Sequence, residues 1–390
     1  MNGSLTGDSN LIKELNKSVV LNTIESQGPI SRAQISKDTG LNKATVSTMV
    51  QFLLDESLVN EIGFGKSGGG RKPMMLYFNN KAGYSIGIDI GVNYILAILT
   101  DLNGNIIQEI NEEIKNTKED IVIQQIFNTI ELLMKSLPRS PYGVIGIGIG
   151  IPAMVDKQDK ILFAPNLDWK NVKLKEVIEE KFNIPTSIKN EANSGALGEL
   201  NYGVGKNSNS IIYISVGIGI GAGIVVNKQL YTGANGISGE LGHLTIDVNG
   251  KKCSCGNRGC WELYASEKAL FNSLEHSDLS SNKTDVNIEN IIAEAKNGNN
   301  EVLNSLNSIG EYLGIGIVNT INSFNPETVI IGNRFALFEN WITNPINRVV
   351  QERLFSTHKS TEILFAKLGK YSIALGASSF MINNFFLNKK

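Results

Sequence analysis

The chain has little of what would assign it quickly to a class of protein. Its 390 residues include no apolar run of about 18, and residues 1–4 do not begin a basic region followed by an apolar stretch. We therefore expect no membrane segment and a cytoplasmic location. The formal net charge is only −2, which excludes a surface that is basic throughout. Any contact with nucleic acid must therefore be local.

Cysteine and histidine are scarce, with three of each, but their placement is informative. Cys253, Cys255 and Cys260 lie within eight residues, and His243 stands ten residues before the first of them. Zinc binds thiolate sulfur and imidazole nitrogen in tetrahedral groups of four, and a site with four protein ligands keeps no open position for catalysis. The pattern predicts a closed, structural zinc site. A set of buried thiols is the alternative.

The first 80 residues have the pattern of a helix-turn-helix domain. Ser31 and Gln34 have the form of a capping box opening a short helix that ends at Gly40, and Asn42 can cap the next helix. Helical spacing of apolar residues supports an earlier helix (Leu11, Leu15, Val19, Ile24) and a buried face on the last one (Val46, Met49, Val50, Leu53). In this motif the second helix of the pair enters the major groove. The candidate DNA contacts are Asn42, Lys43, Ala44, Thr45, Ser47 and Thr48.

Two β-prone runs, 59–64 and 74–78, follow these helices and flank a glycine-rich segment with three basic residues and no acid. A flexible basic loop between two strands is what a wing needs to lie along a phosphate backbone, so Arg71 and Lys72 are further candidate DNA contacts. A solvated linker is the alternative. Because residues 1–80 contain eight basic and seven acidic residues, we expect affinity to depend on base contacts and dimerisation.

From residue 84 onward the chain has an α/β character. Runs at 84–90, 95–101 and 106–114 predict strands, followed by a helix at 119–137 and a strand at 144–151. A second set begins near residue 210, with predicted strands at 211–216, 222–226, 242–247 and 328–331. Two such β-β-β-α-β units around a cleft are the plan of the actin-like, ribonuclease H-like phosphotransferases, although periodicity alone does not separate that fold from other mixed α/β folds.

Specific motifs resemble those of the ROK family of sugar kinases and repressors. The most specific is Gly239-Glu240-Leu241-Gly242-His243, followed by Cys253-x-Cys255-Gly256-x-x-Gly259-Cys260-x-Glu262, which is similar to the zinc signature of the family. Asn190-Glu191-Ala192-Asn193 and the basic Gly68–Pro73 segment look like the repressor branch. The resemblance implies a winged helix-turn-helix domain at 1–80 and a two-lobed sugar-binding domain at 81–390. Its smaller lobe would comprise about 81–188 plus a C-terminal helix at about 373–390, and its larger lobe about 189–372.

The resemblance also implies which residues line the sugar cleft. Sugar hydroxyls both donate and accept hydrogen bonds, so carboxylates and carboxamides can bind them and distinguish their stereochemistry. By similarity to the family these residues are Asn190, Glu191, Glu240 and Glu262, with Asn166 as a weaker candidate. Glu240 and Glu262 flank the predicted zinc ligands, so we expect the metal to hold both carboxylates in place. For either acid alone, a solvated surface charge is the alternative.

A sugar kinase is the rival interpretation, and the phosphate-binding loops weigh against it. Related kinases carry Asp-x-Gly-Gly-Thr, where this chain has Asp89-Ile90-Gly91-Val92-Asn93. Ile218 and Asn333 also stand where those kinases have a threonine and a glycine. Glu191 is one methylene longer than the kinase aspartate, and Lys189 replaces a glutamate, which leaves the charge of the cleft open. We therefore expect no ATP binding and no catalytic residue.

These observations predict a sugar-responsive repressor. One reading head makes few contacts, so we expect a homodimer or higher oligomer on palindromic, double-stranded operator DNA. The resemblance implies D-xylose as the inducer, which would close the two lobes and separate the heads from their half-sites. A regulator that binds a partner protein in place of a sugar remains an alternative.

Overall fold

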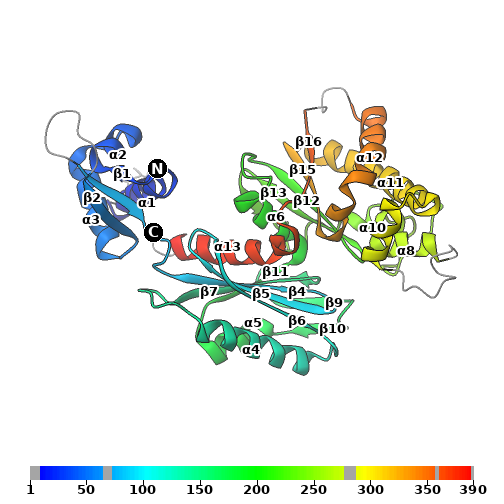
Figure 1. Ribbon diagram of the computed structural model, residues 1–390, viewed down its shortest axis with the longest axis horizontal. Coiled ribbons are helices and arrows are strands. Elements are labelled where there is room, and N and C mark those ends of the chain that lie inside the picture. Colours follow the sequence, from blue (N-terminus) through cyan, green and yellow to red (C-terminus); the bar gives the residue numbers. More distant parts are fainter. Residues whose placement is uncertain (1–8, 65–72, 276–286, 356–359, 388–390) are drawn as a thin grey trace, which may run out of the picture.

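The computed structural model describes residues 9–64, 73–275, 287–355 and 360–387 and is drawn in Figure 1. An N-terminal module, residues 9–78, carries a three-stranded sheet, and two lobes follow, each built on a five-stranded sheet. The α/β class predicted from the sequence is confirmed. Among the described helices, none combines the length and apolar character needed to cross a lipid bilayer.

The N-terminal module contains three helices and three short strands. They are α1 (Ser9–Gln27), β1 (Ile30–Ser31), α2 (Arg32–Thr39), α3 (Lys43–Asp55), β2 (Val59–Phe64) and β3 (Met74–Phe78). Both predicted helix starts are present, because Ser31 Oγ accepts from the Gln34 amide at 3.2 Å and Asn42 Oδ1 accepts from the Thr45 amide at 2.8 Å. Gly40 ends α2 with a left-handed φ of 72°. Local capping at Ser31, Gly40 and Asn42 therefore accounts for where the two helices of the predicted helix-turn-helix begin and where the first one ends.

Helix α1 is also present and packs on the module core through residues in its C-terminal half. Val20, Leu21 and Ile24 are buried, whereas Leu11 and Leu15 keep 59% and 55% of their side-chain area exposed. The helical spacing of Leu11, Leu15 and Val19 therefore identified the helix and not its buried side. Burial of Val46, Met49, Val50 and Leu53 on α3 agrees with the sequence prediction.

The first lobe is a sheet of order β11-β7-β4-β5-β6 with helices on both faces. Its elements are β4 (Tyr84–Ile90), β5 (Tyr94–Asp101), β6 (Ile106–Glu113), α4 (Glu119–Lys135), β7 (Val144–Ile151), α5 (Leu174–Phe182) and β11 (Thr186–Asn190). Strands β8 (Met154–Val155), β9 (Ile161–Ala164) and β10 (Trp169–Val172) form a small separate sheet. Figure 1 shows α4 and α5 on one face of the large sheet and the C-terminal helix, α13 (Ser372–Leu387), on the other.

Alternation along β7 explains how two helical layers share this sheet. Ile147, Ile149 and Ile151 point into the core under α4 and α5. The intervening glycines face α13, and a Cβ on Gly148 would lie only 2.0 Å from the carbonyl oxygen of Ala377. Glycine in β7 therefore lets a helix lie directly against the strand backbone.

The second lobe has a sheet of order β14-β13-β12-β15-β16. Its strands are β12 (Ile211–Val216), β13 (Ile220–Val226), β14 (Gln229–Tyr231), β15 (Thr328–Gly332) and β16 (Glu362–Phe365). Its helices are α6 (Glu191–Tyr202), α7 (Glu262–Ala265), α8 (Glu267–Leu274), α10 (Ile288–Lys296), α11 (Asn300–Phe324) and α12 (Glu339–Arg353), with 3-10 turns η1 (Leu241–His243), η2 (Asn333–Phe338) and η4 (Gly369–Tyr371). Helix α6 packs on one sheet face and also against α13, so these two helices lie between the sheets (Figure 1).

One predicted strand is wrong. Residues 242–247 form no strand: Gly242 lies in η1, and Thr245 makes only an isolated bridge with Cys260. The backbone turns there because Gly242 packs against β13, where a Cβ on it would lie 2.2 Å from the Ile220 carbonyl oxygen. The strand that pairs with the outer side of β13 is instead β14.

Candidate functional site

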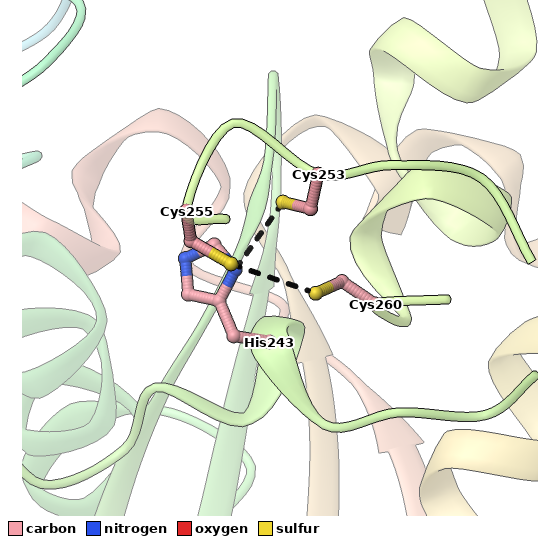
Figure 2. A group of neighbouring side chains, drawn as sticks. All are labelled: His243, Cys253, Cys255 and Cys260. Carbon is pink, nitrogen blue, oxygen red and sulfur yellow. Dashed lines mark hydrogen bonds between the residues drawn. The ribbon is translucent and has the colours of Figure 1, made fainter. Parts of the chain in front are cut away.

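The four predicted metal ligands converge from two short segments. His243 comes from η1, and Cys253, Cys255 and Cys260 come from the loop before α7, with their ligand atoms all within 4.8 Å of one another (Figure 2). The sulfurs of Cys255 and Cys260 are 3.7 Å apart, as are Cys253 Sγ and His243 Nδ1. Tetrahedral zinc with metal–sulfur bonds of about 2.3 Å places its ligand atoms about 3.8 Å apart. The donor set and its spacing therefore fit zinc.

Backbone geometry explains why the loop brings these ligands together. Gly256 and Gly259 adopt left-handed φ values of 95° and 67°, and the Cys253 amide donates to the Asn257 carbonyl at 2.8 Å. Burial raises the pKa of Cys253, and burial raises that of Cys260 to about 12, whereas the backbone amide of Asn257 lowers that of Cys255. Buried thiols of this kind ionise only beside a cation, and a bound metal supplies that charge.

Glu262 connects the metal cluster to the cleft between the lobes. Its Oε1 lies 3.4 Å from His243 Nδ1 and accepts from Cys253 Sγ at 3.3 Å. Its Oε2 faces Gly219, where an added Cβ would lie 2.8 Å away. Glu240 directly precedes η1, and burial raises the pKa of its carboxyl, with the Glu262 carboxylate adding to the increase and His243 opposing it. The structure thus brings both acids to the metal cluster.

Asn190 and Glu191 stand at the junction of β11 and α6. Asn190 caps α6, since its Oδ1 accepts from the Ala192 amide at 2.8 Å while its Nδ2 donates to the Ala153 carbonyl at 3.1 Å. Glu191, the first residue of α6, faces β12 and accepts from Ser215 Oγ at 3.2 Å. Burial raises the pKa of the Glu191 carboxyl. Strand β11 therefore delivers two polar side chains to the space between the sheets.

A narrow cleft of about 70 Å³ joins two of the five sugar candidates. Asn166 and Glu191 both line it, whereas Asn190 lines a neighbouring hollow of about 100 Å³ together with Lys189 and Asn193. Glu262 approaches from the metal cluster, with its Oε2 facing Gly219 in the cleft wall, whereas Glu240 lies near His243 and Glu262 and lines neither hollow. The structure thus brings Asn166 and Glu191 to one hollow, Asn190 to the second hollow and Glu262 to the cleft wall, and it leaves Glu240 beside the metal cluster.

The three loops that hold phosphates in related kinases also meet at this cleft. They contribute Gly91–Tyr94, Gly217–Gly219, Asn333 and Arg334. Tyr94 lies over the first loop and donates to Asp89 Oδ2 at 2.8 Å, and a Cβ on Gly91 would lie 2.1 Å from its ring. Arg334 pairs with Glu267 at 3.1 Å, and Asn333 Nδ2 donates to Ser215 Oγ at 3.1 Å. These loops are therefore filled by the chain's own side chains.

Tyr94 and Asp89 are site residues that sequence reasoning missed. Asp89 is 1% exposed, and burial raises its pKa to about 8, with Glu191 adding to the increase and the hydrogen bond from Tyr94 opposing it. Its Oδ1 has no hydrogen-bond partner among the residues that the structure describes. In the sequence this pair appears as an aspartate at the end of an apolar strand, five residues before a tyrosine. That spacing does not predict a contact by itself. The contact follows from the turn between β4 and β5, which brings the tyrosine back over the aspartate.

The predicted DNA-reading residues lie at the start of α3. Asn42, Lys43, Ala44, Ser47 and Thr48 are exposed and Thr45 is half-buried. Asn42 is partly committed, because its Oδ1 caps the helix, and Thr48 Oγ1 donates to the Ala44 carbonyl at 3.0 Å. Strands β2 and β3 pair antiparallel, as a wing requires. Arg71 and Lys72 lie outside the described residues.

Comparisons with known proteins identify the relatives of this chain. The ROK family model matches residues 85–384. The chain is 48% identical over 379 residues to the xylose repressor of Bacillus spizizenii, covering 97% of each chain. It is similar to the crystal structure of a ROK family transcriptional regulator, a homologue of the E. coli MLC protein, with a TM-score of 0.83, 27% identity and coverage of 96% of this chain and 97% of that one.

A kinase of the same family is similar over a shorter part of the chain. The structure of a ROK family glucokinase from Streptomyces griseus, in complex with glucose and AMPPNP, gives a TM-score of 0.69 and 27% identity. It covers 76% of this chain and 99% of the glucokinase. The regulator therefore matches nearly the whole chain, whereas the glucokinase leaves about a quarter of it without a counterpart.

Proposed function

Because this chain belongs to the ROK family, we propose that it is a transcriptional repressor that releases its operator when D-xylose enters the cleft between its lobes. The observation that carries the proposal is near full-length similarity to a xylose repressor, which extends through the N-terminal module. The exposed start of α3 and the side chains filling the three loops fit a DNA-binding switch better than a kinase. We take the repressor to be cytoplasmic, where the chromosome lies.

In this proposal the chain divides into a DNA-binding domain at 1–80 and a sugar-binding domain at 81–390. The smaller lobe comprises about 81–188 and the C-terminal helix at about 373–390, and the larger lobe about 189–372. The first-lobe and second-lobe sheets support this division, and α13 supports the return of the C-terminus to the smaller lobe. The sugar would lie where the two lobes face each other.

The proposed sugar ligands are the carboxylates and carboxamides around the cleft, namely Asn166, Asn190, Glu191, Glu240 and Glu262. Glu191 and Asn166 already share a hollow, so a hydroxyl placed there can donate to one and accept from the other. A structural zinc held by His243 and the three cysteines would supply the positive charge that keeps the loop closed. Glu262 can then present its outer oxygen to the sugar.

For operator binding, we propose that α3 enters the major groove with its N-terminal residues, Asn42, Lys43, Ala44, Thr45, Ser47 and Thr48, near bases and phosphates. Arg71 and Lys72 of the wing would add phosphate contacts. Two copies are needed on a palindromic, double-stranded operator, because one small head supplies too few contacts for specific binding at cellular salt. Sugar binding closes the lobes and moves the heads off their half-sites.

The direct test is operator-DNA anisotropy titrated with a panel of pentoses and hexoses, each with and without ATP. We expect D-xylose to weaken operator binding and ATP to change nothing. An operator complex that ignores every sugar would contradict the proposal. ADP formation from D-xylose or glucose with ATP would instead support the kinase.

Lys43 offers a test that separates DNA contact from folding. It is exposed at the first position of α3. Among the described residues, its side chain makes no contact that would hold the module together. We expect Lys43→Ala to weaken operator binding about tenfold and to reduce its salt dependence, while D-xylose affinity stays unchanged. Loss of both affinities would show that Lys43 is needed for folding and not for contact.

A further inference from the structure

Lys189, the residue before the proposed sugar ligand Asn190, is partly buried and forms an ion pair with the buried Asp159. Its Nζ lies 2.5 Å from Asp159 Oδ1, and Lys175 Nζ lies 3.6 Å from Asp159 Oδ2. Asp159 is 7% exposed and stands in the turn between β8 and β9 with a positive φ of 64°. The charge of Lys189, which the sequence left open, is therefore compensated by a carboxylate from a different part of the first lobe.

The same lysine also contacts the C-terminal helix. Its Nζ lies 4.8 Å from the centre of the Phe380 ring on α13, within the range of a cation–π interaction. Lys189 thus touches the β8–β9 turn and α13, and it stands in β11 directly before Asn190, the last residue of that strand. A shift of the β11–α6 junction when a sugar binds cannot occur without moving this lysine.

Helix α13 is tightly attached to α6, the helix that begins with Glu191. A Cβ on Gly376 would lie 1.7 Å from the Ser194 carbonyl oxygen, and one on Gly198 would lie 2.0 Å from the Ser372 carbonyl oxygen. Backbones this close allow little sliding, because close-packed interiors transmit displacements instead of absorbing them. The two helices should therefore move as one body.

The other end of α13 reaches the N-terminal module, as Figure 1 shows. Ile382 is buried in the core of that module, and the Phe386 ring lies 6.0 Å from the ring of Phe78 in β3. Phe385 contacts Tyr142 at 5.1 Å between ring centres, and the Tyr142 hydroxyl donates to the Glu56 carbonyl at 2.7 Å. The final turns of α13 therefore pack against the N-terminal module close to the end of α3.

A cavity of about 810 Å³ lies beside this contact, between α1 and the last turns of α13. Leu21 and Glu25 line one side of it, and Ser379, Asn383 and Phe386 line the other. The module is consequently packed against α13 through one set of apolar contacts and has open space next to it.

We propose that Lys189 is a positioning residue that transmits occupancy of the sugar cleft to α13, and through α13 to the DNA-binding module. The proposal rests on the function proposed above. A glutamate at this position, as related kinases have, would face the carboxylate of Asp159 and lose the contact with the Phe380 ring. The lysine is thus suited to a chain in which the cleft must control a distant domain.

The test measures coupling, defined as the operator Kd at saturating D-xylose divided by the operator Kd without sugar. Lys189→Met keeps the aliphatic stem and removes the charge. We expect it to leave operator affinity without sugar within about twofold and to lower the coupling about tenfold, within the usual span of allosteric coupling. Lys175→Met is the matched control, because it removes a partner of Asp159 for which the described residues show no ion pair or ring contact with α13, and its coupling should stay within about twofold of wild type.

Two further single variants keep the test decisive if Lys189→Met folds poorly, and a double variant adds to it if Lys189→Met folds well. Lys189→Arg retains the charge and should restore most of the coupling. Phe380→Leu should lower it, and the Lys189→Met/Phe380→Leu double variant should lose no more than the larger single loss. Undiminished coupling in Lys189→Met, or equal losses in Lys189→Met and Lys175→Met, would overturn the inference. Absence of coupling in the wild type would instead reject the proposed function.

Discussion

Single residues fall into those that sequence alone could identify and those that needed the fold. The metal ligands belong to the first group, because three thiols and an imidazole in one short stretch have few other uses, and the structure brings all four together. Asp89 and Asp159 belong to the second group. Asp89 meets Tyr94 because of the turn that follows its strand. Asp159 meets Lys189, which lies 30 residues further along the chain. No local pattern encodes such pairs.

At the metal centre, Cys255→Ser tests whether the cluster holds zinc and whether the zinc supports the sugar site. Cys255 is exposed, so the change removes a thiolate without opening a cavity. We expect zinc affinity to fall by about 100-fold or more, and D-xylose affinity to fall with it. Zinc content and chelator competition measure the first effect, and calorimetry measures the second.

Ser254→Ala is the matched control, since Ser254 is an exposed neighbour whose Oγ lies 4.0 Å from Cys253 Sγ. It should bind zinc and D-xylose as the wild type does. If Cys255→Ser kept wild-type zinc content, the cysteines would be unligated thiols. If it lost zinc but bound D-xylose normally, the metal would have no part in holding Glu262.

Asp89→Asn tests the buried carboxyl beneath Tyr94. In the folded chain Asp89 keeps its proton up to a pKa of about 8, whereas in the unfolded chain it ionises near its ordinary value of 3.8. Between these values the folded state binds more protons, so this group makes stability fall as pH rises, by at most about 1.4 kcal/mol per pH unit. Asparagine can still accept from the Tyr94 hydroxyl but cannot ionise.

Urea unfolding of both proteins at pH 5 and at pH 8 measures this effect. We expect the free energy of unfolding of Asp89→Asn, relative to wild type, to be higher at pH 8 than at pH 5. An identical difference at the two pH values would mean that Asp89 is ionised in the folded protein throughout.

At the scale of elements, the alternation of apolar residues in strands and the helix-capping residues predicted more of the structure than the helical spacing of apolar residues did. The strands near 84–90, 95–101 and 144–151 and the helix starts at Ser31 and Asn42 were found where the sequence placed them. The strand expected at 242–247 failed because the backbone there packs on β13 through Gly242, a tertiary contact that β-propensity does not express. On α1, spacing of apolar residues found the helix but not its buried face, because helix α1 carries apolar residues on two sides.

The glycines of β7 had a cause that the sequence did not disclose. In β4 and β7, glycine makes room for a helix from the far end of the chain, since Cβ atoms on Gly87 and Gly148 would each lie 2.0 Å from a carbonyl oxygen of α13. That helix contacts strands more than 200 residues away in sequence.

Gly148→Ala tests this close contact. The added methyl group has no room against Ala377, so we expect a loss of about 2 kcal/mol or more in the free energy of unfolding, measured by urea denaturation. Gly221→Ala is the control in another strand, where the new Cβ would lie 3.4 Å from Ala192 Cβ. It should stay within about 1 kcal/mol of wild type. Equal losses in the two variants would show that the glycines serve strand formation in general.

For the whole molecule, the sequence predicted the kinds of parts but not their connection. The ROK motifs pointed to a sugar cleft between two lobes, and the caps pointed to a reading head. The link between them depends on α13, which leaves the first lobe and ends in the core of the N-terminal module. Contacts between residues such as Phe78 and Phe386 join the two ends of the chain, and no window of sequence contains both.

The central claim is that sugar and operator bind to opposing states of one molecule, and thermodynamic linkage tests it most directly. Calorimetry should measure the Kd of D-xylose for the free protein and for the protein saturated with operator DNA. The account predicts that the operator weakens D-xylose binding by the same factor by which D-xylose weakens operator binding. Equal D-xylose affinity in the presence and absence of operator would contradict it.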